Sequence, residues 1–589
     1  MRRRRNERMA DRLWMVALGA GLLAMTAVGQ VETGFVSGLL PQIRQGPLLA
    51  ADRISVRRGV VHALSQAWQR GDRDDVAQLN AILGQEALRR AHWTLKAWEG
   101  VRDEKTGLIP RDPVFLVWNG KDTASDCFPF LLIAAHELEP GSVPLWLDTM
   151  EQARRLGGVL PKTIRLSPVQ VQNDPLRDQI FGAAEYAKDG LLSVCDRLGD
   201  GPWLALMEEM MMEVIEQAPV ETGRGNIPSA GAEANGDLLQ VLPRLYWLTG
   251  KTNYLAMAER IAEVYLFDIM PKNYGFPAAQ WDFVNQRPLR ATFRIRDHGN
   301  ELIPGLTELY YLEKRMGRPK AAEYQGPIQA FLDQLLKVCR TEDGLWYDEF
   351  DTRTLKANTT GVADNWGYVL NAYRTFDLAE GTNRYAAECL RIMQAAAKRK
   401  SFEWEGVKHD GYADTLESMI CQFPREDDPA CREWVDDEME VMFDRQQTWG
   451  FVGGTYLDGN FIRTALLYAD FKSGGVKGVP WRNDLRVGAW VGEGGKTIRV
   501  HVSAMSSWKG VLRFDRPRHR EYWRMPENYP RLNAWPEWYA VSADRDYEVV
   551  NLETGKKQRL KGAELARGYP VTLDGKNPLR MEVTAVPEG

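Results

Sequence analysis

The polar and apolar positions of this chain follow a helical period over most of its length. From about residue 52 to 472, apolar residues recur three and four positions apart, a spacing typical of amphipathic helices. Short and long turns alternate between these helices. The alternation predicts helical hairpins, each closed by a short turn and joined to the next by a long loop.

The short turns share a pattern, a glycine followed four positions later by an aromatic residue. It occurs at Gly199-x-x-x-Trp203, Gly250-x-x-x-Tyr254 and Gly381-x-x-x-Tyr385. Glycine adopts the left-handed conformation that ends a helix, and the ring then covers the turn as the next helix begins. After the second and third glycines, Thr and Asn stand where a helix favours an N-cap. The repeat therefore predicts hairpin turns at these three places.

The long loops are rich in Gly, Pro, Asn and aromatic residues. They fall near residues 100–121, 159–175, 219–232, 270–296, 341–360, 401–410 and 447–458. If all hairpins run in the same direction, these loops lie on one face, and six hairpins close into a ring of inner and outer helices. We predict this ring over residues 75–474, after a lead-in segment at 30–74, with a binding site in its loop-lined mouth.

The pattern changes after about residue 475. Segments at 485–490, 497–502, 547–550 and 579–583 alternate or are β-branched, and Gly, Asp and Asn turns separate them. They predict a β-sandwich-like domain over residues 475–589. Within it, the proline- and aromatic-rich stretch Tyr522–Tyr539 is predicted to be a long loop that packs on the helical domain.

The N-terminus is typical of a targeting segment. Arg2–Arg5 precede the apolar run Leu13–Val28, and Ala27 and Gly29 are small residues suited to a cleavage point. About 16 apolar residues are few for a bilayer span, so a cleaved signal peptide at 1–29 is favoured over an uncleaved anchor. Both alternatives predict export to the periplasm or the extracellular space, and only the anchor would hold the protein at a membrane.

Composition and charge narrow the classes of partner and cofactor. The net charge is −5 over 589 residues, and no basic stripe lies outside the N-terminus, which excludes a nucleic-acid partner. The six cysteines form no disulfide framework; Cys421 and Cys431 flank a turn and could bridge, and buried free thiols are the alternative. The sequence has no C-x-x-C or H-E-x-x-H motif, so we expect no metal and no cofactor.

Many acidic residues lie where the predicted inner helices begin, at the proposed mouth. They are Asp122, Asp178, Asp237, Asp297, Asp364, Asp410 and Asp458. Two roles compete for them: an N-cap that satisfies free backbone N–H groups, and a catalytic carboxylate in the mouth.

The densest cluster of chemically useful residues is RIRDHGNE, which runs from Arg294 to Glu301. On a helix, His298 and Glu301 would share one face. A carboxylate beside an imidazole and two arginines performs acid–base work while it holds an anionic group. The alternative is a capping and salt-bridge network at a helix start.

A second cluster, HDGYADTLE at His409–Glu417, places Asp410, Asp414 and Glu417 on one helical face. Close carboxylates repel each other, which raises the pKa of one of them as an acid catalyst requires. Solvated charges on an exposed face are the alternative.

Tryptophans form a third set, each in or beside a long loop and near a carboxylate or amide. They are Trp118, Trp281, Trp346, Trp366 and Trp449. Rings that stack on a pyranose, with acids and amides binding its hydroxyls, are typical of sugar sites; core packing is the alternative for any single ring. The candidate substrate-binding residues are Trp118, Asp122, Arg294, Arg296, Trp366 and Trp449.

This chain resembles the six-hairpin (α/α)6-toroid carbohydrate-active superfamily of glycoside hydrolases, polysaccharide lyases and sugar epimerases. The resemblance rests on the hairpins with Gly-turn-aromatic junctions, the aromatic–acid loops, the export signal and the C-terminal β domain. The resemblance covers roughly residues 75 to 475. RDHGNE at 296–301 and DGYAD at 410–414 are similar to inner-helix starts of such proteins, and neither matches the catalytic signature of one family. The resemblance implies a mainly α (α/α)6 toroid and a carbohydrate substrate, but a fold does not fix the reaction.

The leading hypothesis is an exported glycoside hydrolase acting on an oligo- or polysaccharide, with a uronate suggested by the arginines of the first cluster. Its paired catalytic carboxylates would be Glu301 with Asp410 or Asp414, and Asp364 is the next candidate. The sequence leaves inversion and retention of the anomeric centre open.

Two other functions stay open. A polysaccharide lyase would use His298 or Tyr412 as the base, and Arg296 or Asn300 to neutralise a uronate. A glycan-binding protein without catalytic activity would use the same mouth.

Overall fold

The computed structural model describes residues 51–112, 115–406, 408–452 and 459–587. The signal peptide predicted at 1–29 and the first part of the lead-in segment lie outside the described residues. Within the described ranges, no helix is both long and apolar enough to cross a bilayer.

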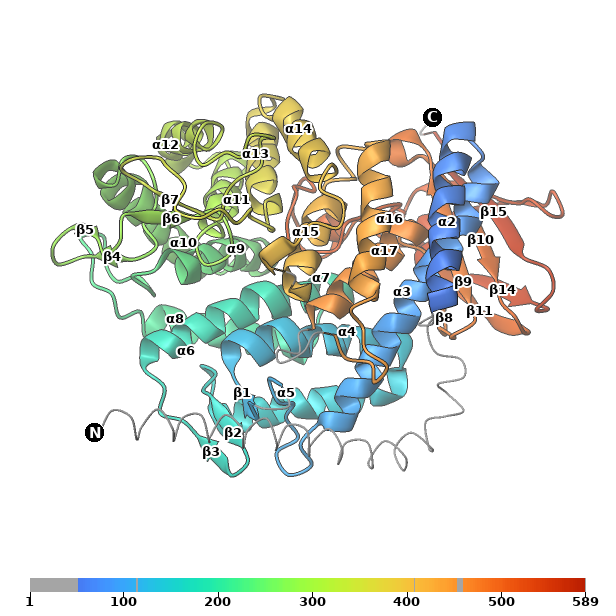
Figure 1. Ribbon diagram of the computed structural model, residues 1–589, viewed down its shortest axis with the longest axis horizontal. Coiled ribbons are helices and arrows are strands. Elements are labelled where there is room, and N and C mark those ends of the chain that lie inside the picture. The colour runs from blue at the N-terminus through green and yellow to red at the C-terminus, as the bar shows by residue number, and fades with distance from the viewer. Residues whose placement is uncertain (1–50, 113–114, 407, 453–458, 588–589) are drawn as a thin grey trace, which may run out of the picture. The chain divides into compact units, whose positions relative to one another are not determined.

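Within the residues that the structure describes, six helical hairpins with short turns build most of the helical region (Figure 1). The helices reached through long loops are α4 (Phe128–Leu138), α6 (Leu176–Glu185) with its continuation α7 (Leu192–Leu198), α9 (Ala232–Thr249), α11 (Leu302–Arg315), α13 (Gly367–Glu380) and α15 (His409–Ile420). Their partners across the short turns are α5 (Val143–Gly157), α8 (Pro202–Glu216), α10 (Thr252–Glu263), α12 (Lys320–Leu335), α14 (Ala386–Ala396) and α16 (Pro429–Phe443).

Contacts between neighbouring inner helices close these hairpins into a ring. The inner helices pack in sequence order from α4 through α6–α7, α9, α11 and α13 to α15. A further pair completes the circle: α17 (Asn460–Ser473) packs on α15 and α4, and α3 (Arg73–Val101) packs along α17. The helix α2 (Ala51–Arg70) lies against α3 and α16. The predicted toroid of helical hairpins is thereby confirmed.

The repeated glycines end helices as their spacing predicts. The backbone φ is +77° at Gly199, +71° at Gly250 and +67° at Gly381, the left-handed region that glycine adopts without strain. The indole of Trp203 donates from Nε1 to the carbonyl of Gly199 at 2.8 Å, so the ring covers the turn.

The predicted N-caps after these turns are wrong. Neither α10 nor α14 has a side-chain N-cap. At the start of α14, the carboxylate of Asp377 from the preceding helix accepts from the backbone N–H of Arg384 at 2.7 Å and of Tyr385 at 2.8 Å. A carboxylate from across the turn therefore satisfies donors that a local Thr or Asn would satisfy elsewhere.

The C-terminal strands form two antiparallel sheets. One has the order β13-β12-β15-β10-β9 and the other the order β14-β11-β8. The strands are β8 (Lys477–Val479), β9 (Arg486–Val491), β10 (Thr497–Ser503), β11 (Trp508–Arg513), β12 (Asp546–Asn551), β13 (Lys557–Lys561), β14 (Tyr569–Leu573) and β15 (Leu579–Ala585). Side chains from both sheets share one apolar core that includes Val500, Leu512 and Val583. The strand β9 packs on α3, which joins this region to the toroid (Figure 1).

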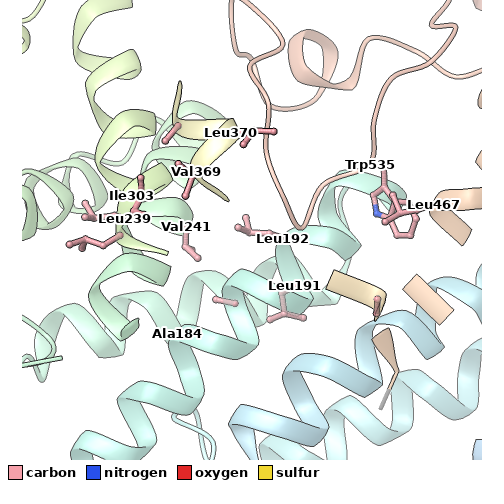
Figure 2. Close-up of a cluster of buried hydrophobic side chains, with 14 of the residues drawn as sticks. Ala184, Leu191, Leu192, Leu239, Val241, Ile303, Val369, Leu370, Leu467 and Trp535 are labelled. Atoms are coloured by element: carbon pink, nitrogen blue, oxygen red, sulfur yellow. The ribbon is translucent and has the colours of Figure 1, made fainter. Parts of the chain in front are cut away.

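The stretch Tyr522–Tyr539, which we call the floor loop, packs on the helical region as predicted and contains no helix or strand. Its indoles and hydroxyls bind inner helices: Trp523 Nε1 donates to Asp196 Oδ1 at 2.7 Å, and Tyr529 donates to Glu308 Oε2 at 2.9 Å. Figure 2 shows the loop descending towards the helix of Leu191 and Leu192, with Trp535 among the buried apolar side chains. A segment of the β region thus enters the centre of the ring.

The candidate disulfide is not formed. Cys421 and Cys431 are both buried free thiols, which is the alternative that the sequence left open.

Candidate active site

A cavity of about 690 Å³ lies at the N-terminal ends of the inner helices, where the long loops were predicted to form a mouth. This volume is typical of a small-molecule site. Its wall is unusually rich in charge. The acidic residues are Asp122, Asp126, Glu185, Asp189, Glu233, Asp297, Glu301, Glu405, Asp410, Asp414 and Glu417, and the basic residues are Arg111, Lys121, Lys188, Arg296, Lys408, Arg445 and Arg463.

Two π-helical segments supply one side of this wall. The segment η1 (Gly120–Cys127) carries Lys121, Asp122 and Asp126, and η3 (Tyr186–Leu191) carries Lys188 and Asp189. A π-helical turn shifts the helical register, and such turns are frequent at functional sites. The two segments pack closely on each other: an added Cβ at Gly190 of η3 would lie 3.1 Å from the carbonyl oxygen of Ser125 of η1.

Asp410 stands at the electrostatic centre of the acidic wall. Its charge helps to raise the pKa of Asp126 and Asp414 well above the usual range, and burial is the largest cause for both. It acts in the same direction on Asp297, whose pKa burial raises to about 6, and on Asp364, whose pKa burial raises to about 8. Several carboxyls around one charged carboxylate therefore hold protons near neutral pH.

Asp410 and Asp414 have different partners on α17. Asn460 donates from Nδ2 to Asp410 Oδ1 at 2.9 Å. Arg463 lies 2.9 Å from Asp414 Oδ1 and 3.3 Å from Glu417 Oε2, so its guanidinium bridges two carboxylates one helical turn apart. This contact gives Asp414 a structural role, because loss of the cation would leave the buried Glu417 and the partly buried Asp414 without their basic partner.

Glu301 is engaged by the backbone that precedes it. Its Oε1 accepts from the N–H of His298 at 3.1 Å, and its Oε2 accepts from the N–H of Gly299 at 2.8 Å. This is the capping network that the sequence left as the alternative for the first cluster. His298 itself has a φ of +71°, contacts the carboxylate of Glu233 through Nδ1, and has its pKa lowered by burial.

The bottom of the cavity holds a buried cation among carboxylates. Lys188 Nζ lies 2.9 Å from Asp189 Oδ1 and 3.3 Å from Asp237 Oδ1 on α9. Burial outweighs this cation and raises the pKa of Asp237 to about 8, with the charges of Glu301 and Asp189 adding to the effect. Burial also raises the pKa of Glu185, where Asp237 is the next cause.

We expect Asp237→Asn to stabilise the protein increasingly as pH rises from 5 to 8. The folded-state pKa of Asp237 lies above the unfolded value of about 3.9, so the native protein binds this proton more tightly and loses stability as pH rises through that window. Asparagine does not titrate, so it removes this loss, which amounts to up to about 1.4 kcal/mol in the free energy of unfolding per pH unit. Urea unfolding at pH 5, 6.5 and 8 measures it. A difference between variant and wild type that does not change with pH would contradict the prediction.

The structure brings six of the predicted site residues to the cavity wall. They are Asp122, Arg296, His298, Glu301, Asp410 and Asp414. Asp364 lies directly behind the wall, since an added Cβ at Gly411 would be 3.0 Å from its Oδ2.

The other predicted site residues do not line the cavity. Trp118 and Trp366 are fully buried in the hydrophobic core, where the Trp366 indole donates to Thr415 Oγ1 at 3.1 Å. Trp449 is 43% exposed, and it and Arg294 are absent from the described cavity wall. Trp118 and Trp366 therefore follow the alternative of core packing, because large apolar rings gain most from full burial.

The acids at the helix starts do not act as N-caps. Within the described ranges, α6, α9, α11, α13, α15 and α17 all lack a side-chain N-cap. Asp364 accepts only from the next backbone N–H, that of Asn365, at 3.0 Å. Asp458 lies outside the described residues. N-capping is therefore not the role of the aspartates at these helix starts.

Sequence reasoning missed Asp126, Glu185, Lys188 and Asp189. The signal for the acids is their spacing: Asp122 and Asp126 are four apart, as are Glu185 and Asp189, so each pair shares a helical face. Lys188 and the floor loop had no comparable signal, because their place depends on the register shift of η3 and on a tertiary contact.

No group of three or more His, Cys, Asp or Glu side chains suited to a metal ion is found among the described residues.

Comparisons with known proteins give likenesses of fold. A cellobiose 2-epimerase from Bacillus thermoamylovorans matches with a TM-score of 0.39 and 9% identity, over 66% of this chain and 99% of that one. An unsaturated glucuronyl hydrolase specific for heparin has a TM-score of 0.38 and 13% identity, over 66% of this chain and 95% of that one. An inactive variant of an alpha-1,6-mannanase from Salegentibacter, in complex with alpha-1,6-mannotriose, has a TM-score of 0.38 and 12% identity, over 65% and 98%.

No family model and no curated protein sequence matches the chain.

Proposed function

We propose that this protein is a glycoside hydrolase in which Asp126 is the general acid and Asp410 is the general base or nucleophile. The observation that carries the proposal is the pairing of these two carboxyl groups, on η1 and α15, in one cavity wall. Burial and neighbouring charges, that of Asp410 among them, keep Asp126 protonated. Glycosidases divide acid and base work between two carboxyls in this manner.

The sequence favoured Glu301 with Asp410 or Asp414. We retain Asp410 and replace Glu301 by Asp126, because the carboxylate oxygens of Glu301 and Asp414 bind other groups. Glu301 accepts two backbone N–H groups, and Asp414 is paired with Arg463. A carboxylate that holds a helix start or a buried cation is costly to free for proton transfer. Asp126 and Asp410 are therefore assigned the roles of general acid and of general base or nucleophile.

The substrate class is a glycan, and its charge is the open question. Arg296, one of the arginines behind the uronate hypothesis, pairs with Asp297 at 3.0 Å and with Glu405. Lys121 at the mouth is exposed, and within the described residues its Nζ forms no ion pair. A uronate would therefore be recognised by Lys121. Export remains part of the proposal, on the N-terminal sequence alone.

A lyase or epimerase is the second candidate, and His298 favours it. Its lowered pKa makes the imidazole neutral at physiological pH, and 48% of its side chain is exposed at the cavity. A neutral imidazole is a suitable base for removing a carbon-bound proton.

Incubation with a panel of neutral and uronate-bearing oligosaccharides tests these functions. Hydrolysis gives new reducing ends with incorporation of water, and NMR of the first product anomer separates inversion from retention. A lyase gives unsaturated ends that absorb in the ultraviolet, and an epimerase changes configuration without cleavage. Absence of hydrolysis across the panel, with unsaturated ends or an epimerised sugar as the product instead, would overturn the hydrolase proposal.

A further inference from the structure

The tip of the floor loop forms part of the cavity bottom. Leu532 lines the cavity, and Asn533 beside it is only 2% exposed. Asn533 has a φ of +53°, a left-handed conformation that asparagine tolerates better than most residues. The carbonyl of Asn533 accepts from Ser193 Oγ at 3.0 Å, so the tip is tied to the inner helix α7.

Asn533 connects three inner helices at this point through its side chain and its backbone N–H. Its Nδ2 donates to Asp189 Oδ1 at 2.9 Å and lies 3.2 Å from the hydroxyl of Tyr368. Its backbone N–H donates to Glu417 Oε1 at 3.2 Å. All three partners line the cavity. The amide orientation follows from chemistry, because only the NH₂ end can donate to a carboxylate.

One hydrogen-bond acceptor of Asn533 has no donor among the described residues. Oδ1 of Asn533 is buried, and no described group donates to it. A buried carbonyl oxygen without a donor is unfavourable. Because Asn533 follows the lining residue Leu532 and bonds three residues of the cavity wall, its free oxygen points to a donor supplied by a molecule bound in the cavity. Sugar hydroxyls are donors of this kind.

We propose that Asn533 is a positioning residue of the active site, which fixes the Asp189 carboxylate and the Tyr368 hydroxyl at the cavity floor and presents its amide oxygen to a substrate hydroxyl. The inference rests on the proposed function and assigns part of the site to the C-terminal β region. The toroid alone would then lack a complete floor.

The position of Asp189 matters for the proposed acid. The groups that face Asp126 are Asp122 on its own segment, Lys188 and Asp189 on η3, and Asp410 on α15. Among them, the charge of Asp189 raises the pKa of Asp126, second only to burial. If Asp189 is no longer held, the pKa of Asp126 falls, and the acid loses its proton at a lower pH.

The test compares Asn533→Gly with Trp535→Phe in the full-length protein. Glycine keeps the left-handed backbone without strain, so this variant removes only the side chain. Trp535→Phe is the matched control on the same loop, because it deletes the hydrogen bond from Nε1 to Ser193 O at 3.0 Å, and neither Trp535 nor Ser193 lines the cavity. Both variants should lower Tm slightly.

For Asn533→Gly we expect kcat to fall about 10- to 100-fold with KM within about threefold, as for misplaced catalytic groups. The alkaline limb of its pH–rate profile should move to lower pH, and Trp535→Phe should keep the wild-type kcat and profile. Wild-type kcat and profile in Asn533→Gly, or equal losses in both variants, would overturn the inference. Asp410→Asn separates the two proposals: if that variant is inactive while Asn533→Gly is fully active, only this inference fails.

Discussion

Asp410→Asn is expected to abolish turnover of the glycan substrate and, at the same time, to stabilise the protein. Removal of the base or nucleophile should lower kcat about 10²- to 10⁴-fold. The stabilisation has a separate cause: the charge of Asp410 raises the pKa of Asp126, Asp297, Asp364 and Asp414, so it repels four neighbouring carboxyls. Asparagine removes that repulsion and keeps a side-chain oxygen for the amide of Asn460.

Reducing-end release and thermal unfolding measure the two effects. Asp428→Asn is the matched control, because Asp428 also begins a helix of the same hairpin but lies outside the cavity. Its Oδ1 accepts from the backbone N–H of Ala430 at 2.9 Å and of Cys431 at 3.0 Å, and asparagine caps a helix about as well. Full activity in Asp410→Asn would exclude it from catalysis, and a large drop in Tm would show that its charge supports the fold.

The architecture could be predicted because it depends on patterns that are local in the sequence. Gly199, Gly250 and Gly381 end helices through their own backbone freedom, which depends on no distant contact. The same turns separate short connections from long loops, and the long loops do lead to the cavity. Period-two segments after residue 475 likewise became the strands of two sheets.

The roles of individual site residues could not be predicted in the same way. Glu301 and Asp414 carry the right chemistry in the right place, yet backbone N–H groups engage one and Arg463 engages the other. Spacing along the sequence shows which side chains share a helical face, but not which partner each one meets across the ring. Tryptophans in loops are equally ambiguous, since Trp118 and Trp366 pack inward.

The proposed acid shows what tertiary structure adds. Asp126 becomes a candidate only when Asp189 from η3 and Asp410 from α15 approach it and burial removes water from its carboxyl group. None of these contacts is local in sequence. The pKa of a carboxyl is set by its surroundings, so a sequence motif can nominate an acid but cannot say which one keeps its proton.

Asp126→Asn is expected to lose activity in a way that depends on the leaving group. An amide cannot supply the proton that departing sugar oxygens require, so turnover of a natural glycan should fall about 10²- to 10⁴-fold. An aryl glycoside whose phenol leaves without protonation should be hydrolysed by the variant within about tenfold of the wild-type rate, whereas Asp410→Asn should fail on both substrates. Asp178→Asn is the control, since Asp178 is an exposed acid in the first turn of α6, outside the cavity wall. Equal loss on both substrates would show that Asp126 is not the acid.

The pH–rate profile gives a second readout of the same acid. Because the pKa of Asp126 is raised, the acid of the wild type stays protonated, and the alkaline decline in activity should begin only as pH rises through that pKa. This alkaline limb should be missing from the Asp126→Asn profile measured with the aryl glycoside.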